Sequence, residues 1–205
     1  NDFKIYKRII VIHFIVATHP EAKPFIDFFK LKKRLEVTEF EIYKNTKKNI
    51  SLTISGIGKY FSAISVTHTF FEFGAIKNNA WINFGLAGHK TLKIGEIAFV
   101  NKISDKNNAT MTFFPFCLKN HGFQNKNCIT YESQNYKLNN SLSDMECSGF
   151  FFSANKYSTK ELIHSIKFIS DNEKNSIDFK NKKIIYDLIF KNIYKVEGFI
   201  KEIHE

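Results

Sequence analysis

The chain has 205 residues and a formal net charge of +10, and 43% of its residues are hydrophobic and 16% aromatic. This length fits a single domain over residues 1–205, and the hydrophobic content predicts a packed core rather than a disordered chain. The charge comes almost entirely from lysine, since Arg8 and Arg34 are the only arginines. Proteins that read nucleic acids favour the bidentate guanidinium group. The composition therefore argues against a nucleic-acid partner.

The cysteines and the apolar segments bear on cellular location. Cys117, Cys128 and Cys147 form neither a C-x-x-C pair nor a zinc-ligand spacing, and an odd number of scattered cysteines fits reduced thiols. The apolar run at residues 9–17 is shorter than the roughly 20 residues that a membrane span needs. It also lacks a signal-peptide cleavage site. We therefore expect a soluble, cytoplasmic protein with no membrane partner.

Strands and helices alternate along the chain, which predicts an α/β protein with a largely parallel or mixed sheet. The β-branched and aromatic run at residues 8–17 predicts a central strand buried on both faces. Phenylalanines at helical spacing follow it. Two strands are expected on either side of the polar turn at residues 45–49, and then a helix that begins near residue 59 and stops at Gly74.

The second half of the chain is expected to contain two buried strands, a polar loop excursion, a helix, a strand that ends in an acid, and one terminal amphipathic helix. In that order, these segments span residues 80–88, 95–103, 104–127, 141–157, 163–172 and 181–205. Open α/β sheets bind ligands beyond the carboxyl ends of their strands. Three such ends carry polar or glycine-rich sequences: A-T-H-P-E (17–21), N-F-G-L-A-G-H (83–89) and F-I-S-D-N (168–172).

Each short motif has an ordinary structural explanation. The two glycines of S-G-I-G-K (residues 55–59) allow backbone N–H groups to approach a ligand, but they also suit a tight turn, and the motif is not a P-loop. Asp171 follows a strand, where aspartate commonly forms turns or caps. Asp144 and Glu146 precede a helix, whose N-terminal partial charge they complement. No single motif is decisive.

The order of the motifs is more specific. A strand followed by Glu21, then S-G-I-G-K, N-F-G-L-A-G, D-M-E and S-D-N, resembles the nucleoside phosphorylase/nucleosidase superfamily, and within it the methylthioadenosine/adenosylhomocysteine nucleosidase-like branch. The resemblance covers residues 9–179. It implies a single α/β/α domain whose central mixed sheet forms a distorted barrel. It also implies a cytoplasmic homodimer that cleaves the N-glycosidic bond of a purine nucleoside, acts in nucleoside catabolism and methionine salvage, and needs no metal or organic cofactor.

The resemblance assigns roles to the acidic residues. Asp171 matches the general acid that protonates or hydrogen-bonds N7 of the purine, and Ser170 matches a residue that orients it. Glu146 matches the glutamate that accepts hydrogen bonds from the ribose 2′- and 3′-hydroxyls, and Met145 packs under the sugar. Glu21, aligned across a one-residue gap, matches the glutamate that activates the attacking water.

The resemblance also assigns the apolar lining of the substrate site. Leu86, Ala87 and Gly88 fall in the glycine loop that lines the base and ribose pocket. Ile57 falls in the loop that contacts the 5′ side of the nucleoside. Phe179 lies near the aromatic residue that covers the purine or the 5′ end.

Two points stay open. The purine-stacking residue has no clear match between residues 104 and 140, where Tyr131 is the candidate. Phosphorolysis needs an anion site, usually built with arginine, and neither arginine lies in a glycine loop, so hydrolysis of methylthioadenosine, adenosylhomocysteine or a related nucleoside is favoured. Lys59 and Lys167 keep a phosphorolytic enzyme as an alternative. A catalytically inert nucleoside-binding protein is the other.

Overall fold

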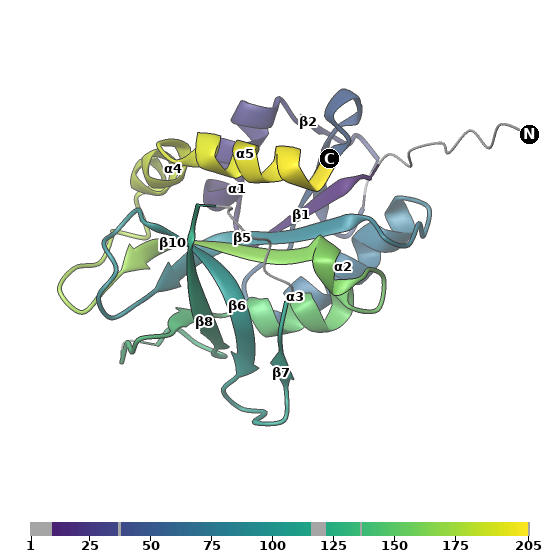
Figure 1. Cartoon of the computed structure of the whole chain (residues 1–205). Coiled ribbons are helices and arrows are strands. Elements are labelled where there is room, and N and C mark those ends of the chain that lie inside the picture. Colours follow the sequence, from purple (N-terminus) through teal and green to yellow (C-terminus); the bar gives the residue numbers. More distant parts are fainter. Residues whose placement is uncertain (1–9, 37, 116–121, 136, 205) are drawn as a thin grey trace, which may run out of the picture.

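The computed structural model describes residues 10–36, 38–115, 122–135 and 137–204, whose strands form one ten-stranded mixed sheet (Figure 1). Cys117, residues 8–9 of the first predicted strand and residues 116–121 of the predicted excursion lie outside these ranges. The elements are, in order, β1 (Ile12–Val16), α1 (His19–Phe29), β2 (Lys32–Lys33), β3 (Glu41–Asn45), β4 (Ile50–Ile54), α2 (Lys59–Glu72), β5 (Ala80–Gly88), β6 (Ile97–Asp105), β7 (Thr112–Phe113), β8 (Gln124–Thr130), β9 (Leu142–Asp144), α3 (Cys147–Ala154), β10 (Ile163–Asp171), α4 (Lys182–Phe190) and α5 (Ile193–His204).

Part of the sheet closes into a barrel. Strand β5 pairs with β10 on one side and β9 on the other, and the ring is completed through β6 and β8. Strands β1, β4, β3 and β2 continue the sheet outward from β5. Parallel pairs such as β1–β4 and β5–β10 occur beside antiparallel ones such as β10–β6. The predicted α/β architecture, with a mixed sheet that forms a distorted barrel, is confirmed.

Strand β1 is buried on both faces, as its almost continuous apolar sequence predicts. Every residue of β1 is buried, and α1, α4 and α5 cover one face of the sheet while α2 and α3 lie on the other (Figure 1). On the first face, the rings of Phe25 and Phe84 stack with centroids 4.5 Å apart. None of the helices in the described ranges has the length and apolarity that a membrane span requires.

Two expectations for the second half of the chain are wrong. Residues 104–127 are not only a loop, because β6 runs on to Asp105, β7 follows, and β8 begins at Gln124. Strand β8 escapes prediction because only Cys128 and Thr130 of its side chains are buried, so its sequence is mostly polar. Likewise, the segment predicted as mostly helix first forms β9, which pairs with β8.

The predicted terminal helix is two helices. Helix α4 ends at Phe190 and α5 begins at Ile193. Asn192 lies in the break, and its side-chain Nδ2 donates a hydrogen bond to the carbonyl of Gly95 (3.2 Å). This contact anchors the break to the segment between β5 and β6.

Helices α2 and α3 cross in backbone contact at Gly149. A Cβ atom at this position would overlap the carbonyl group of Lys59, in the first turn of α2. Because a backbone carbonyl moves only if its helix moves, the sequence needs glycine here. The crossing holds the start of α2 beside the start of α3, and both starts border the site described below.

Replacing Gly149 by alanine should therefore force the two helices apart. We expect Gly149→Ala to lower the free energy of unfolding, measured by urea denaturation, by about 1–3 kcal/mol. Gly198→Ala is the control, because a Cβ at Gly198 in α5 meets nothing within 4 Å. That change should be neutral or stabilise by up to about 1 kcal/mol. Equal effects of the two substitutions would contradict the close crossing.

Candidate active site

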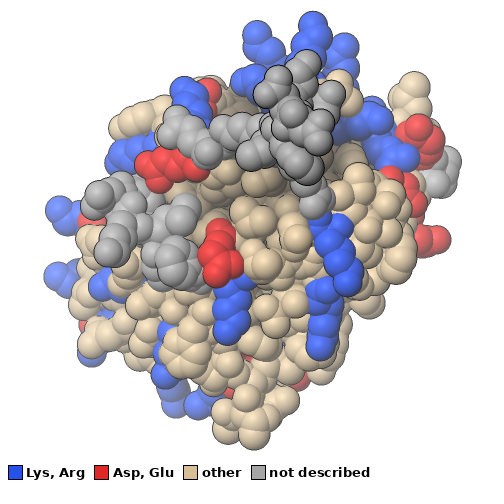
Figure 2. Space-filling view, turned by 45° about the vertical axis from the view of Figure 1, so that its right-hand side comes forward, with Lys and Arg blue, Asp and Glu red and all other residues tan. Residues whose placement is uncertain are grey.

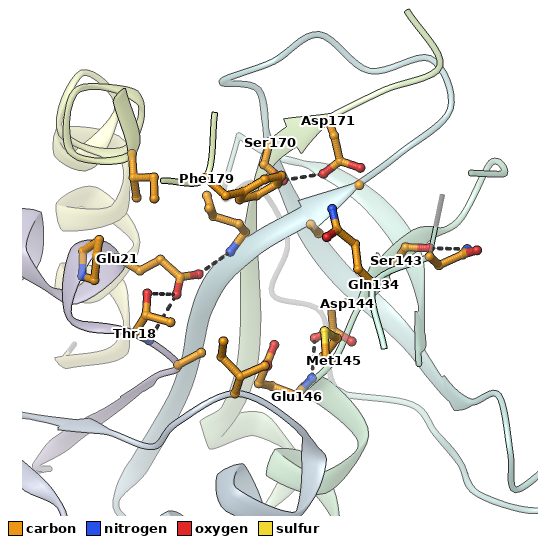
Figure 3. A pocket seen from close by; sticks show the side chains of 18 residues that line it. Thr18, Glu21, Gln134, Ser143, Asp144, Met145, Glu146, Ser170, Asp171 and Phe179 are labelled. Carbon is orange, nitrogen blue, oxygen red and sulfur yellow. Dashed lines mark hydrogen bonds between the residues drawn. The ribbon is translucent and has the colours of Figure 1, made fainter. Parts of the chain in front are cut away.

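A cavity of about 460 Å³ lies at the carboxyl ends of β1, β5 and β10 and at the junction of β9 with α3 (Figure 3). Its size is that of a small-molecule site. The structure brings to this cavity all ten residues that the family resemblance assigned to the site. They are Glu21, Ile57, Leu86, Ala87, Gly88, Met145, Glu146, Ser170, Asp171 and Phe179.

The register of the barrel places Asp171 against Gly88. The two residues are paired at the ends of β10 and β5, and a Cβ on Gly88 would lie only 2.5 Å from Asp171 Oδ2. The hydroxyl of Ser170 donates to Asp171 Oδ1 (2.6 Å). The carboxyl group of Asp171 therefore packs closely against the Cα atom of Gly88 and accepts a hydrogen bond from Ser170.

Glu146 immediately precedes α3, and its side chain lines the cavity. It is 8% exposed, and its Oε1 accepts a hydrogen bond from the backbone N–H of Gly58 (2.8 Å). Gly58, the second glycine of S-G-I-G-K, has φ +105°, which L side chains rarely adopt. Burial, reinforced by the nearby charge of Asp144, raises the pKa of Glu146 to about 7. This carboxyl group thus changes charge near neutral pH.

Asp144 lies behind Glu146 and forms a buried ion pair. Its Oδ2 is 2.7 Å from Lys167 Nζ, and both side chains are 0% exposed. The same carboxylate accepts hydrogen bonds from Cys147 N (2.8 Å) and Thr130 Oγ1 (2.8 Å), so it caps the start of α3. Burial alone would lower the pKa of Lys167, but the charge of Asp144 and weaker neighbours raise it, which keeps the lysine protonated.

Glu21 is held between α1 and β5. Its Oε2 accepts hydrogen bonds from the N–H (3.1 Å) and hydroxyl (2.5 Å) of Thr18, and its Oε1 accepts one from Leu86 N (2.9 Å). A Cβ at Gly85 would lie 3.5 Å from Glu21 Oε1 and 3.4 Å from Lys167 Nζ. The carboxylate of Glu21 thus caps the N-terminus of α1 and lines the cavity. It lies near the buried Lys167.

Lys59 and Lys167, the two lysines that would bind phosphate in a phosphorolytic enzyme, are both paired with acidic residues. Lys59 Nζ lies 2.9 Å from Asp105 Oδ2 and 3.2 Å from Glu132 Oε1. Lys167 is paired with Asp144 and does not line the cavity. Among the described lining residues there are four carboxylates and no lysine or arginine.

The loop between β8 and β9 supplies residues that the sequence interpretation missed. Gln134 and Asn135 line the cavity, whereas the structure does not bring Tyr131 to it, so the proposed stacking role of Tyr131 is wrong. Asn135 Nδ2 donates to Ser143 Oγ (3.1 Å). Both amides follow the carboxyl end of β8, so recognition of that strand would have pointed to them.

One cluster has the composition of a metal site. Cys128, Asp144 and Cys147 bring ligand atoms within 4.8 Å of one another behind the cavity. Their surroundings do not fit a cation, because Lys167 already neutralises Asp144. Burial also raises the pKa of the Cys128 thiol well above its ordinary value, which disfavours the thiolate that a metal needs.

Several solved structures share this fold. The chain is similar to 5′-methylthioadenosine nucleosidase of Arabidopsis thaliana (TM-score 0.77, 15% identity, 94% of this chain and 96% of that chain covered). It is also similar to futalosine hydrolase of Helicobacter pylori (0.73, 14%, 95% and 99%) and to 5′-methylthioadenosine/S-adenosyl homocysteine nucleosidase of Campylobacter jejuni (0.71, 15%, 95% and 99%). No family model matches the sequence, and neither does any curated protein. The likeness therefore shows that the chain shares the fold of these proteins.

Removing one partner of the buried ion pair should be costly. Lys167→Met leaves Asp144 charged and unpaired, so we expect the free energy of unfolding to fall by about 3–5 kcal/mol. Adding Asp144→Asn removes the stranded charge and should recover part of the loss. The control is Lys23→Met in the exposed pair with Asp27, which should cost less than about 1 kcal/mol in the same denaturation assay. Similar losses at Lys167 and Lys23 would refute the buried pair.

Proposed function

We propose that the chain is a nucleosidase that hydrolyses the N-glycosidic bond of a purine nucleoside, namely methylthioadenosine, adenosylhomocysteine or a related compound. The observation that carries the proposal is the meeting of Asp171, Glu146 and Glu21 at one cavity, from three different elements, within a fold shared with nucleosidases. We place the enzyme in the cytoplasm, in nucleoside catabolism and methionine salvage.

The carboxyl groups of Asp171, Glu146 and Glu21 each have a separate role in the proposed reaction. Asp171, as the acid, gives a proton to N7 while the C1′–N9 bond breaks and its electrons go to the base. Glu146 accepts hydrogen bonds from the ribose hydroxyls, and its negative charge stabilises the positive charge that develops on the sugar. Glu21 takes a proton from a water molecule whose oxygen bonds to C1′. The products are the neutral base and a free sugar, and solvent returns the proton from Glu21 to Asp171.

Hydrolysis suits this cavity better than phosphorolysis. A phosphate nucleophile would enter a space lined by four acidic residues with no described basic side chain on its walls, and an ionised carboxylate there repels an anion strongly where water is scarce. A neutral water molecule meets no such barrier. Base release in phosphate-free buffer, with free sugar as the second product, tests the proposal. Strict dependence on phosphate would instead support the phosphorylase, and no release from any purine nucleoside would support the inert binding protein.

Asp171→Asn removes the proton that the leaving base needs. We expect kcat to fall by about 100-fold or more, with nucleoside affinity little changed because the amide fills the same space. Asp27→Asn, which alters an exposed acid on α1, is the matched control and should keep full activity. Near-normal turnover by Asp171→Asn would rule out its role as the acid.

The raised pKa of Glu146 predicts the pH dependence. Its ionised form accepts the ribose hydrogen bonds, so the acid limb of the profile should be set by the pKa of about 7, and activity should fall as pH drops through it. We expect kcat/KM to decrease by about tenfold per pH unit below that value. Glu146→Gln should be slower and should lack this acid limb. A wild-type profile that stays flat between about pH 5.5 and 8 would contradict the assignment.

Two copies of the chain are proposed to associate through the outer side of α2. Tyr60, Phe61, Ile64 and Phe71 are each 56–69% exposed there. The face that Figure 2 turns forward has a broad area without charged side chains, bordered by lysines. Large apolar side chains exposed along one helix, as on α2, are typical of interfaces.

Light scattering should give twice the chain mass for the wild type and the chain mass alone for Ile64→Lys. Tyr194→Lys, on α5 at the opposite face of the sheet and 60% exposed, should remain dimeric. A monomeric wild type would refute the dimer.

A further inference from the structure

His89 directly follows β5 and carries an imidazole that the proposed reaction does not use. The residue is 1% exposed. Its Nδ1 lies 3.2 Å from the backbone nitrogens of both Thr91 and Leu92. Its Nε2 lies 3.1 Å from the carbonyl oxygen of Asn140, 51 positions away in the chain. One ring nitrogen is thus bonded to the turn after β5, and the other to a distant segment.

These partners fix the protonation state of the ring. Two backbone N–H groups can only donate, so Nδ1 accepts, and a carbonyl oxygen can only accept, so Nε2 donates. His89 is therefore the neutral imidazole with its proton on Nε2. Burial lowers the pKa of His89, and the bond to Asn140 opposes only part of this effect, which agrees with the neutral form.

Asn140 belongs to the segment between β8 and β9, which forms one wall of the cavity. Two residues of this segment line the cavity, as described above. The bond from His89 has a neighbour, because the backbone N–H of Lys90 donates to the carbonyl oxygen of Asn139 (3.0 Å). Two consecutive residues after β5 therefore hold the end of the segment.

This attachment lies next to the proposed acid, Asp171. The backbone N–H of His89 donates to the carbonyl oxygen of Asp171 (3.0 Å). A Cβ on Gly88 would lie 2.6 Å from Leu138 Cδ2 as well as 2.5 Å from Asp171 Oδ2. Leu138, from the same wall segment, and Asp171 therefore both pack against the Cα atom of Gly88. The place of the wall and the surroundings of the acid are set together.

We infer that His89 is a positioning residue of the site, whose bond to Asn140 fixes the β8–β9 wall against the strand ends that carry Gly88 and Asp171. The inference rests on the proposed function, since the wall matters to catalysis only if the nucleoside binds in this cavity. A loosened wall must be ordered when the nucleoside binds, and this weakens apparent affinity. The wall carries none of the three reacting carboxyl groups, so the loss falls on KM rather than on kcat.

Two substitutions separate the two bonds of the imidazole. The amide of asparagine reaches the position of Nδ1. His89→Asn therefore keeps an acceptor for the N–H groups of Thr91 and Leu92 but loses the bond to Asn140. The amide of glutamine reaches the position of Nε2. His89→Gln therefore keeps a donor for Asn140 but leaves the two N–H groups of the turn without their acceptor. Each variant is the matched control of the other.

Base release from methylthioadenosine and urea denaturation are measured on the full chain. His89→Asn should raise KM by about three- to tenfold, the effect of one neutral hydrogen bond. Its kcat should change less than about twofold, and its urea midpoint should stay near that of the wild type. His89→Gln should restore KM to within about twofold of the wild type but lower the urea midpoint by about 0.5 M. A purely structural histidine would instead give losses in KM and in stability that rise together.

Hydrogen exchange adds a measurement that needs no turnover. Amides of residues 137–141 should exchange about tenfold faster in His89→Asn than in the wild type and in His89→Gln. Wild-type KM and exchange in His89→Asn, or a KM that rises equally in both variants, would overturn the role of His89 alone. Absence of base release by the wild type would overturn the nucleosidase, and the exchange rates would still decide whether His89 holds the wall.

Discussion

The buried ion pair between Asp144 and Lys167 is the contact on which the arrangement of the site depends. Two charges without solvent exposure are stable only when paired and hydrogen-bonded. Asp144 meets this need by also accepting from Thr130 and from the backbone of Cys147. These bonds tie β10 and β8 to the start of α3. Glu146, one residue before α3, is thereby directed into the cavity. Asp171, at the end of β10, lines the same cavity.

The same pair organises the charge of the site. Among the described residues, four acidic side chains line the cavity. Lys167 supplies a compensating positive charge from behind the cavity wall and does not itself line the cavity. Burial and the nearby charge of Asp144 raise the pKa of Glu146 to about 7, and the charge of Lys167 offsets only part of this rise. An acidic cavity of this kind favours a substrate that becomes positively charged as it reacts. It disfavours an anionic nucleophile.

The sequence predicted the parts of the structure that are buried on both sides. Strand β1 is an almost continuous apolar run, and β5 and β10 are buried along nearly all of their length. The family resemblance, rather than these runs, pointed to Glu21, Gly88 and Asp171 beyond or at their carboxyl ends. Strand β8 was missed because its first half is exposed and polar. The loop beyond it was missed as well, and with it Gln134. The break before α5 contains Asn192, whose side chain bonds to a residue 97 positions away, a contact that local helical periodicity does not contain.

A crystal structure of Asp171→Asn soaked with methylthioadenosine tests the central claim most directly, because the variant should bind the nucleoside without cleaving it. We expect the purine beside residue 171, the ribose hydroxyls on Glu146, and the 5′ group toward Ile57 and Phe179. A nucleoside bound outside this cavity, or bound with its base at Glu146 and its sugar at residue 171, would contradict the account.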